Sequence, residues 1–291
     1  MHEQLEDILS AIDGKIADLS PRALQEELQR VPLEVLGRIQ IDRPAQFPNL
    51  MAWLPSMPSK GTQRAWTGEA DHALLGKSVN FIRMAIGGHQ GTTGKPISQG
   101  SALDFGCGWG RMIRLLYKYV PADRIYGVDP WDESIRLCKE CSLHANLFVS
   151  DYVPRSLPTP TETRFDLIIA FSVFTHLSEK VAKIAAGTLR DVLSETGTIA
   201  LSIRPREYWL RDVKFVSKQE ARQFLRDHDD KGFAFFPHKR AKIEGEVTYG
   251  DTSMSLDFIR SNFEGLRIAG VEWSELDPLQ LIVFLKKSSD A

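Results

Sequence analysis

The sequence has little cysteine, no excess of charge of one sign and no long apolar run, and each shortage argues against a class of protein. Its 291 residues include only 3 cysteines, which argues against a disulfide-stapled secreted domain. The formal net charge of -2 leaves no basic field for bulk nucleic-acid binding. No run of about 18 apolar residues occurs and the N-terminus does not resemble a signal peptide, so we expect no membrane span and a cytoplasmic location.

Metal-binding patterns are missing as well. Cys138 and Cys141 have the CxxC spacing of a metal or redox pair, but no second pair completes a zinc site. We interpret them as small apolar residues on a helix. The sequence has no HxH or HExxH pattern and no clustered acidic pattern, so we expect no metal centre.

The chain begins with a helical region. Apolar residues at intervals of three and four predict amphipathic helices over residues 1–40. Residues 41–63 contain prolines and no period, which indicates a loop that wraps over a larger body. We therefore expect residues 1–63 to form an extension and residues 64–291 to form the main domain. The apolar stripe of the extension packs either on its own domain or on a second copy in a homodimer.

The rest of the chain alternates between strands and helices. A helical stretch over residues 64–86 ends at a glycine-rich break over 87–94, and short apolar runs then alternate with helices. This predicts a parallel sheet with helices on both faces. The last two runs are too close for a crossover helix and predict an antiparallel hairpin. The expected strands are 101–105, 124–128, 146–149, 165–171, 197–203, 266–274 and 279–287, and the expected helices are 109–119, 131–142 and 178–195.

Three glycines at alternate positions follow the first of these strands. Gly106, Gly108 and Gly110 form GxGxG, whereas the dinucleotide fingerprint places its third glycine one residue later. Asp104 precedes the turn, where a carboxylate would repel a pyrophosphate at the helix N-terminus. It would attract a cofactor that carries a cation and a free amino group. Asp129, 19 residues after Gly110, has about the spacing of a carboxylate that binds ribose.

These residues belong to a series of four motifs. LDFGCGWGR at 103–111, YGVDPW at 126–131, VSDY at 149–152 and FDLIIAFSVFTHL at 165–177 follow one another at plausible spacings. The series resembles that of the class I S-adenosylmethionine-dependent methyltransferases over roughly residues 95–205. The resemblance implies an α/β, Rossmann-like fold with a seven-stranded, mostly parallel sheet and an antiparallel terminal hairpin, here preceded by the N-terminal helical extension.

The resemblance also implies S-adenosylmethionine (S-adenosyl-L-methionine) as the cofactor. Asp104 and the backbone of the turn would face its methionine part, and Asp129 would accept hydrogen bonds from both ribose hydroxyls. Arg111 is either a helix-surface cation or the partner of the cofactor carboxylate. Trp109 either closes the cofactor pocket or packs under the N-terminal helices. Asp151 either binds the exocyclic amine or is a turn residue.

The remaining cofactor contacts implied by the resemblance come from four places in the chain. Pro130 and Trp131 would pack on the adenine, and the segment 66–68 would fold over the cofactor. Phe171 and Ser172, at the end of the fourth strand, would lie under the sulfonium. The full expected set is Trp66, Thr67, Gly68, Asp104, Gly106, Cys107, Gly108, Trp109, Gly110, Arg111, Asp129, Pro130, Trp131, Ser150, Asp151, Tyr152, Phe171 and Ser172.

Methyl transfer to a hydroxyl favours a base beside the acceptor. His176 follows the fourth strand at the edge where α/β folds bind ligands, and it is either that base or a helix-entry residue near Ser178. Residues 206–262 form an insertion with a Ser217 to Glu220 capping box and an aromatic stretch at 233–236. The aromatic stretch fits either a lid over the acceptor or a core hairpin. The candidate catalytic residues are His176, His238, Tyr249 and Asp251.

The motif FSVFTHLSE, a later YGD and Gln280 resemble bacterial methyltransferases found with glycan and polysaccharide assembly. We therefore expect an S-adenosylmethionine-dependent methyltransferase that O-methylates a small polar acceptor, a sugar or glycan hydroxyl. N- or C-methylation of another small molecule stays open. A nicotinamide-dependent sugar oxidoreductase or epimerase is disfavoured by the glycine spacing and by the lack of a Tyr-x-x-x-Lys pair after the fourth strand. A non-catalytic methyltransferase-like module that binds a partner through its N-terminal helices is the third alternative.

Overall fold

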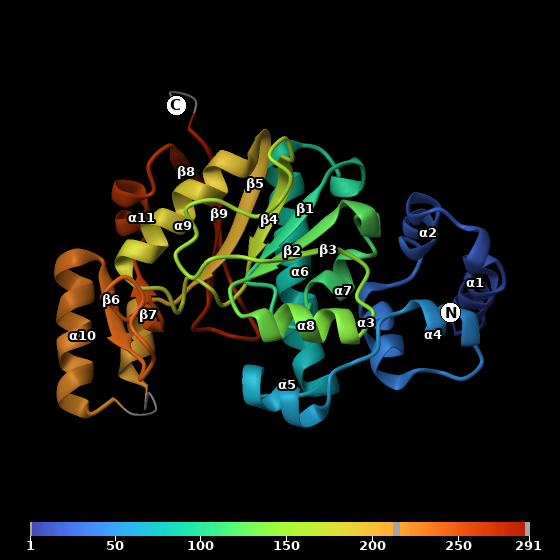
Figure 1. Ribbon diagram of the computed structural model, residues 1–291, viewed down its shortest axis with the longest axis horizontal. Coiled ribbons are helices and arrows are strands. Elements are labelled where there is room, and N and C mark those ends of the chain that lie inside the picture. The colour runs from blue at the N-terminus through green and yellow to red at the C-terminus, as the bar shows by residue number, and fades with distance from the viewer. Residues whose placement is uncertain (1, 212–215, 289–291) are drawn as a thin grey trace. The chain divides into compact units, whose positions relative to one another are not determined.

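The computed structural model describes residues 2–211 and 216–288. The chain divides into two compact units. Unit 1 falls within Met1–Arg83 and Pro96–Val149, and unit 2 within Met84–Lys95 and Ser150–Ala291. Unit 1 contributes the strands β3-β2-β1 and unit 2 the strands β4-β5-β9-β8 to a seven-stranded sheet (Figure 1). The predicted α/β, Rossmann-like fold is confirmed.

The N-terminal part of unit 1 is helical, as predicted for residues 1–40. Ser20 caps the second helix through its side chain, and proline follows at the first helical position, where no hydrogen-bonded N–H is lost. Apolar side chains such as Ile12, Leu28 and Leu36 are buried within the unit. The helices are α1 (His2–Lys15), α2 (Pro21–Leu28), α3 (Leu33–Asp42), α4 (Pro48–Trp53) and α5 (Lys60–Thr67), with the 3-10 turn η1 (Ile16–Asp18).

Two predictions for this region are wrong. Residues 41–63 are not a loop, because α4 and the start of α5 lie within them. Pro48 occupies the first turn of α4, where proline is tolerated, and the Ser59 side chain caps α5. The helix predicted over 64–86 is interrupted, since Gly68 ends α5 with a φ of 81° before α6 (Asp71–Thr93) begins.

The predicted glycine break at 87–94 is also wrong, because α6 continues to Thr93. A Cβ on Gly88 would lie 2.2 Å from the ring of Phe284 in β9. The glycine is there for close packing of the helix on the sheet of unit 2, and this packing outweighs its low helix propensity.

The strands of unit 1 are parallel, as predicted. β1 (Ala102–Phe105) pairs with β2 (Ile125–Asp129), and β2 pairs with β3 (Asn146–Val149). The 3-10 turns η2 (Ile97–Gln99) and η3 (Ala122–Arg124) precede β1 and β2. The helix predicted over 109–119 is much shorter, since α7 spans only Ile113–Leu116 and the glycine turn takes up the residues before it. α8 (Asp132–Glu140) carries Cys138 fully buried, which is consistent with an apolar role.

Unit 2 holds the other strands of the sheet. β4 (Phe165–Ala170) and β5 (Leu193–Ile203) are parallel, and β9 (Leu281–Lys287) is antiparallel to both β5 and β8 (Leu266–Trp273). The predicted terminal hairpin is therefore confirmed. α9 (Glu179–Val192) connects β4 to β5, and α11 (Leu256–Asn262) precedes β8.

The insertion at 206–262 forms a small layer of its own, of which residues 212–215 lie outside the described residues. It contains η4 (Arg206–Leu210), α10 (Lys218–Lys231), and a two-stranded antiparallel sheet of β6 (Phe233–Pro237) and β7 (Gly250–Met254). The predicted capping box at the start of α10 is present. Figure 1 shows α10 beside β6 and β7. Among the described residues, no helix has the length and apolar character needed to cross a membrane.

Candidate active site

The glycine turn between β1 and α7 depends on backbone conformations that side chains disfavour. Gly106, Gly108 and Gly110 have φ values of 75°, 54° and 77°. The Gly106 amide donates to the Val128 carbonyl at 2.8 Å, which fixes the turn to β2. A Cβ on Gly110 would lie 2.2 Å from Leu143, whereas a Cβ on Gly108 would meet nothing within 4 Å. Gly108 therefore leaves open space in which a ligand can approach the backbone.

A buried carboxyl group stands just before this turn. Asp104 is 2% exposed, and its Oδ2 atom has no hydrogen-bond partner among the described residues. Burial raises the pKa of Asp104 to about 7; Arg111 lowers it and Asp129 raises it. Arg111 is partly buried, interacts with Asp104 and Glu69, and donates to Ser78 Oγ at 3.4 Å. Burial lowers the pKa of Arg111 to about 10, although the Asp104 and Glu69 charges raise it.

Asp129, at the end of β2, accepts a backbone hydrogen bond on each carboxylate oxygen. Gly108 donates to Oδ2 and Trp131 donates to Oδ1, both at 2.9 Å. Burial raises the pKa of Asp129, while the hydrogen bonds from Trp131, Gly108 and Ser134 lower it. A carboxylate has about four acceptor positions, so these three hydrogen bonds leave one of them open. A ligand hydroxyl could use this position.

Two of the predicted aromatic residues meet beside Asp129. The rings of Trp66 and Trp131 lie 4.5 Å apart between centroids, tilted by 34°, and Trp131 is 44% exposed. Both line an open hollow with residues of α5 and α8. Thr67 donates to backbone carbonyls at the end of α5, and Gly68 ends that helix. Pro130 is partly buried next to Trp131.

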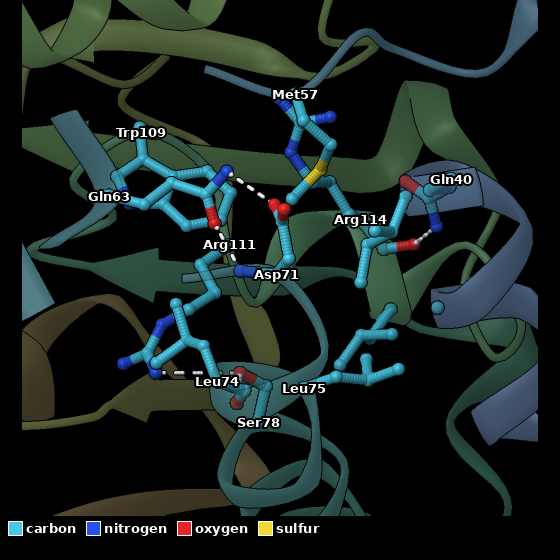
Figure 2. Close-up of a pocket in the computed structure, with 13 residues that line it drawn as sticks. Gln40, Met57, Gln63, Asp71, Leu74, Leu75, Ser78, Trp109, Arg111 and Arg114 are labelled. Carbon is cyan, nitrogen blue, oxygen red and sulfur yellow. Dashed lines mark hydrogen bonds between the residues drawn. The ribbon is translucent and has the colours of Figure 1, made fainter. Parts of the chain in front are cut away.

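The other two side chains of the turn point into the protein. Cys107 is 5% exposed and Trp109 is 3% exposed. The Trp109 ring centroid lies 5.4 Å from Arg114 Cζ, a cation–π contact. Trp109 also lines a cavity with residues of α3, α5 and α6 (Figure 2). Its ring therefore lies beside Arg114 and this cavity, and both arrangements expected for it stay predictions.

The cofactor-binding residues predicted after β3 lie at the start of the second segment of unit 2. Ser150 is buried at 7% exposure, Asp151 is exposed, and Tyr152 is 44% exposed. The last two side chains are accessible to a ligand.

The backbone just after β4 is strained at Ser172, a residue predicted to contact the cofactor. Ser172 has a φ of 59°, unusual for a residue with a Cβ. Its amide donates to Ser202 Oγ at 2.7 Å, and its hydroxyl lies 3.2 Å from Thr175 Oγ1. Phe171, which precedes it, is partly buried. Backbone strain held by such hydrogen bonds is common at functional sites.

The four predicted catalytic residues lie together in unit 2. Asp251 Oδ2 accepts a hydrogen bond from His238 Nε2 at 3.0 Å, and Asp251 Oδ1 lies 3.8 Å from His176 Nδ1. The Tyr249 ring stacks on the His176 ring at 4.9 Å with 6° between the planes. The residues come from the segment after β4 and from both sides of the β6–β7 pair, so the pairing of β6 with β7 assembles the cluster.

The hydrogen bonds distinguish the two histidines. His176 Nδ1 lies 2.7 Å from the Gly250 carbonyl, which can only accept, so Nε2 carries the lone pair. That atom lies 3.4 Å from Arg204 Nη2. Burial and the Arg204 charge lower the pKa of His176 to about 4. His238 donates from Nε2 to Asp251, which leaves its lone pair on Nδ1, and its side chain is 34% exposed.

Arg204 belongs to the cluster although the sequence analysis did not select it. Its Nη1 donates to Asp251 Oδ1 at 2.5 Å and to the Thr175 carbonyl at 2.9 Å, and its guanidinium lies 4.1 Å from the Tyr208 ring centroid. Burial raises the pKa of Asp251, but the hydrogen bonds from His238 and Arg204 and the Arg204 charge lower it below the usual value. Arg204 follows a predicted strand directly, where α/β folds place ligand-binding residues, and this signal could have identified it.

We compared the chain with protein families and with solved structures. Residues 102–197 match the profile of a family described as a methyltransferase domain. An S-adenosylmethionine-dependent methyltransferase from Clostridium acetobutylicum ATCC 824 has 13% identity and a TM-score of 0.50, over 78% of this chain and 96% of that chain. The PH0226 protein from Pyrococcus horikoshii OT3 has 17% identity and a TM-score of 0.54, over 79% and 100%. No curated protein matched. Residues 102–197 are thus similar to a methyltransferase domain, and the two solved structures share the fold.

The residues of the glycine turn and of β2 fit S-adenosylmethionine, the cofactor that the sequence motifs imply, at three points. Asp104 Oδ2 is a buried acceptor without a partner, suited to an ammonium group. The space beside Gly108 would be filled by a Cβ, so glycine keeps it open. Asp129 keeps an acceptor position for a ribose hydroxyl.

Proposed function

We propose that the chain transfers a methyl group from S-adenosylmethionine to a hydroxyl of a small polar acceptor, and that this acceptor is a sugar or glycan. The observation that carries the proposal is the pair formed by His238 and Asp251, in which a partly exposed histidine keeps an available lone pair. When bound, the cofactor supplies a methyl group on an activated sulfonium. The protein then has to position the acceptor oxygen and accept its proton.

We assign cofactor binding to the turn and its neighbours in unit 1. Asp104 would accept hydrogen bonds from the ammonium group, and Asp129 would bind the ribose. Trp131 and Trp66, whose rings contact each other, would pack on the adenine. Arg111 would face the carboxylate of the methionine part.

We assign the proton acceptor to Nδ1 of His238. Nδ1 would accept the hydroxyl proton of the acceptor as its oxygen becomes methylated. Asp251 holds the ring through Nε2 and stabilises the charge that the ring gains. Arg204 in turn fixes Asp251. His176 is unsuited to this role, because its lone pair faces Arg204 and its pKa is about 4.

Aromatic side chains around this pair support a sugar acceptor. The Phe236 and Tyr249 rings lie 6.1 Å and 5.6 Å from the His238 ring between centroids, and both are partly exposed. Partly exposed rings beside polar groups bind sugars by stacking and hydrogen bonding. Phe233, in contrast, is buried against Phe258 as in a core hairpin. We propose that the insertion at 206–262 covers the acceptor.

The test is transfer of labelled methyl groups to a panel of glycosides, sugar nucleotides and matched amino sugars. We expect methyl ethers as products, and a kcat for His238→Gln that is about 10²–10⁴-fold lower, the range for general-base catalysis, with unchanged cofactor affinity. His72→Gln is the control, since His72 is exposed and pairs with Asp42. Absence of cofactor binding, methylation of amines alone, or full kcat in His238→Gln would each contradict the proposal.

A further inference from the structure

The connection between β6 and β7 in unit 2 is an extended hairpin of residues 238–249, here called the acceptor hairpin. His238 and Tyr249 stand at its base, where the His238 amide donates to the Tyr249 carbonyl at 3.1 Å. At its tip, the amides of Ile243 and Glu246 donate to each other's carbonyls at 2.8 Å and 3.2 Å. Residues 239–242, between base and tip, are exposed. Such an exposed segment with few backbone hydrogen bonds opens easily unless its tip is attached elsewhere.

The tip of the acceptor hairpin holds a residue that its backbone disfavours. Glu244 and Gly245 are the two central residues of the turn, with φ values of 53° and 86°. Positive φ at both positions is the type I′ pattern, for which Asn, Asp and Gly are preferred at the first position. Glutamate lacks the short side chain that stabilises a left-handed backbone through local hydrogen bonds. The turn alone therefore does not explain a glutamate at position 244.

The Glu244 carboxylate has two cationic partners outside the hairpin. Arg155 Nη1 donates to Oε1 at 2.6 Å and Arg155 Nη2 donates to Oε2 at 2.9 Å, so the pair has two parallel hydrogen bonds. Lys180 Nζ lies 3.4 Å from Glu244 Oε2 and 3.1 Å from Glu246 Oε1. An isolated surface ion pair contributes little, but bidentate geometry and a network of charges are the exceptions. Both exceptions are present at this tip.

Both cations come from parts of unit 2 that are fixed by packing. Arg155 follows Pro154, whose carbonyl accepts a hydrogen bond from Thr188 Oγ1 of α9 at 2.6 Å, and Thr188 is buried. Lys180 lies in the first turn of the same helix, next to the fully buried Val181. The two cations thus attach the tip of the acceptor hairpin to the body of unit 2 at α9.

We propose that Arg155 is a positioning residue for the acceptor. Its ion pair with Glu244, supported by Lys180, forms a latch that holds the acceptor hairpin closed and keeps His238 and Tyr249 in place. This inference rests on the proposed function, in which His238 accepts the proton of the acceptor. Arg155 acts through the hairpin and is not itself assigned to contact the acceptor. The latch also accounts for the glutamate in the turn, because only a long carboxylate side chain there serves both cations.

Two variants remove the latch in different ways. In Glu244→Asn the shorter, neutral side chain cannot form the ion pair, while asparagine before Gly245 is the preferred type I′ sequence and keeps the turn. Arg155→Met removes the cation and leaves the turn unchanged. Both should melt at about the wild-type temperature, since the exchanged side chains are exposed. Arg260→Met removes another exposed ion pair, with Asp257 on α11, and is the control.

Hydrogen–deuterium exchange of peptides from residues 238–249 in the full chain measures opening of the hairpin without any ligand. Wild-type exchange should become faster between about 50 mM and about 500 mM sodium chloride, because salt screens an exposed pair. At low salt, Arg155→Met and Glu244→Asn should exchange about three- to tenfold faster than wild type. The double variant should add little to Glu244→Asn, since both changes remove one contact. Arg260→Met should match wild type. Wild-type exchange in both single variants would overturn the proposal.

Methyl transfer distinguishes positioning from a merely structural contact. With the glycoside that the panel described above identifies, KM for the acceptor should rise about two- to tenfold in both single variants, because fewer molecules hold the hairpin closed. The kcat should stay within about twofold, since the pair of His238 and Asp251 is unchanged. The cofactor Kd from calorimetry should stay at the wild-type value.

Two outcomes of the kinetic measurement would overturn the positioning role. The first is faster exchange of the hairpin with an unchanged KM, which would make the latch a structural contact alone. The second is methylation of no glycoside at all, which would remove the proposed function together with the positioning role. Hydrogen–deuterium exchange needs neither cofactor nor acceptor, so it distinguishes a missing latch from a failure of the proposed function.

Discussion

The Asp104→Asn substitution is expected to stabilise the cofactor-free protein while weakening its function. Asp104 is fully buried in β1, and its Oδ2 has no partner among the described residues. Burial is the main reason that its pKa is about 7 instead of 3.8. The folded protein therefore resists the ionisation that an unfolded chain allows freely.

The magnitude and sign follow from proton linkage. Between pH 3.8 and about 7 the folded state holds the Asp104 proton more tightly than the unfolded state, so the free energy of unfolding falls as pH rises. The loss is absent below pH 3.8 and complete above pH 7. At about 1.4 kcal/mol per pKa unit it amounts to roughly 4 kcal/mol. Asparagine cannot ionise, so the variant lacks this loss.

Urea denaturation of both proteins without cofactor, from pH 4.5 to 8, measures the effect. The free energy of unfolding of Asp104→Asn minus that of wild type should grow by about 3 kcal/mol over this range. Asp257→Asn is the control, since its side chain is 90% exposed, and its difference from wild type should stay nearly flat. A difference for Asp104→Asn that does not change with pH would refute the reasoning.

Cofactor binding should show the opposite dependence on pH. An ammonium group at Asp104 favours the ionised carboxylate, so binding releases a proton below pH 7. Calorimetry should find that wild-type affinity rises with pH between 5.5 and 7, by at most about tenfold per pH unit. In Asp104→Asn the affinity should be lower and nearly independent of pH. Equal pH profiles in the two proteins would remove Asp104 from the cofactor site.

Three further substitutions test other parts of the structure. Gly110→Ala places a Cβ against Leu143 at a positive φ, so urea denaturation should show a loss of about 1–3 kcal/mol; wild-type stability would contradict the turn geometry. His176 has its pKa lowered to about 4 by burial, so stability should be lost as pH falls from about 6.5 toward 4, by roughly 3 kcal/mol at most. His176→Asn should lack this pH dependence, and an unchanged profile would argue against the buried neutral ring. Trp131→Ala should weaken cofactor binding by about 1 kcal/mol or more in calorimetry through lost stacking. The control Trp273→Ala, at a 57% exposed position, should bind as wild type, and equal effects of both would contradict an adenine site at Trp131.

The sheet could be predicted from the sequence because its strands are short, apolar and buried. β1 is buried at every position, as a central parallel strand requires, and its apolar run was recognisable. The closeness of β8 and β9 in sequence left only an antiparallel pairing. The ends of the helices were harder to predict where contacts with other elements determine them. Gly88 continues α6 because a ring of another element lies against it, and sequence spacing alone does not contain that contact.

The candidate site, too, could be predicted from the sequence only in part. Asp104, Asp129 and the glycines could be selected because they lie close together along the chain in a recognisable order. His238 and Asp251 were selected only as polar residues in an aromatic stretch. Their hydrogen bond depends on the register of β6 and β7, in which Pro237 pairs with Gly250. Such a register, and the place of Arg204 beside it, requires the three-dimensional structure.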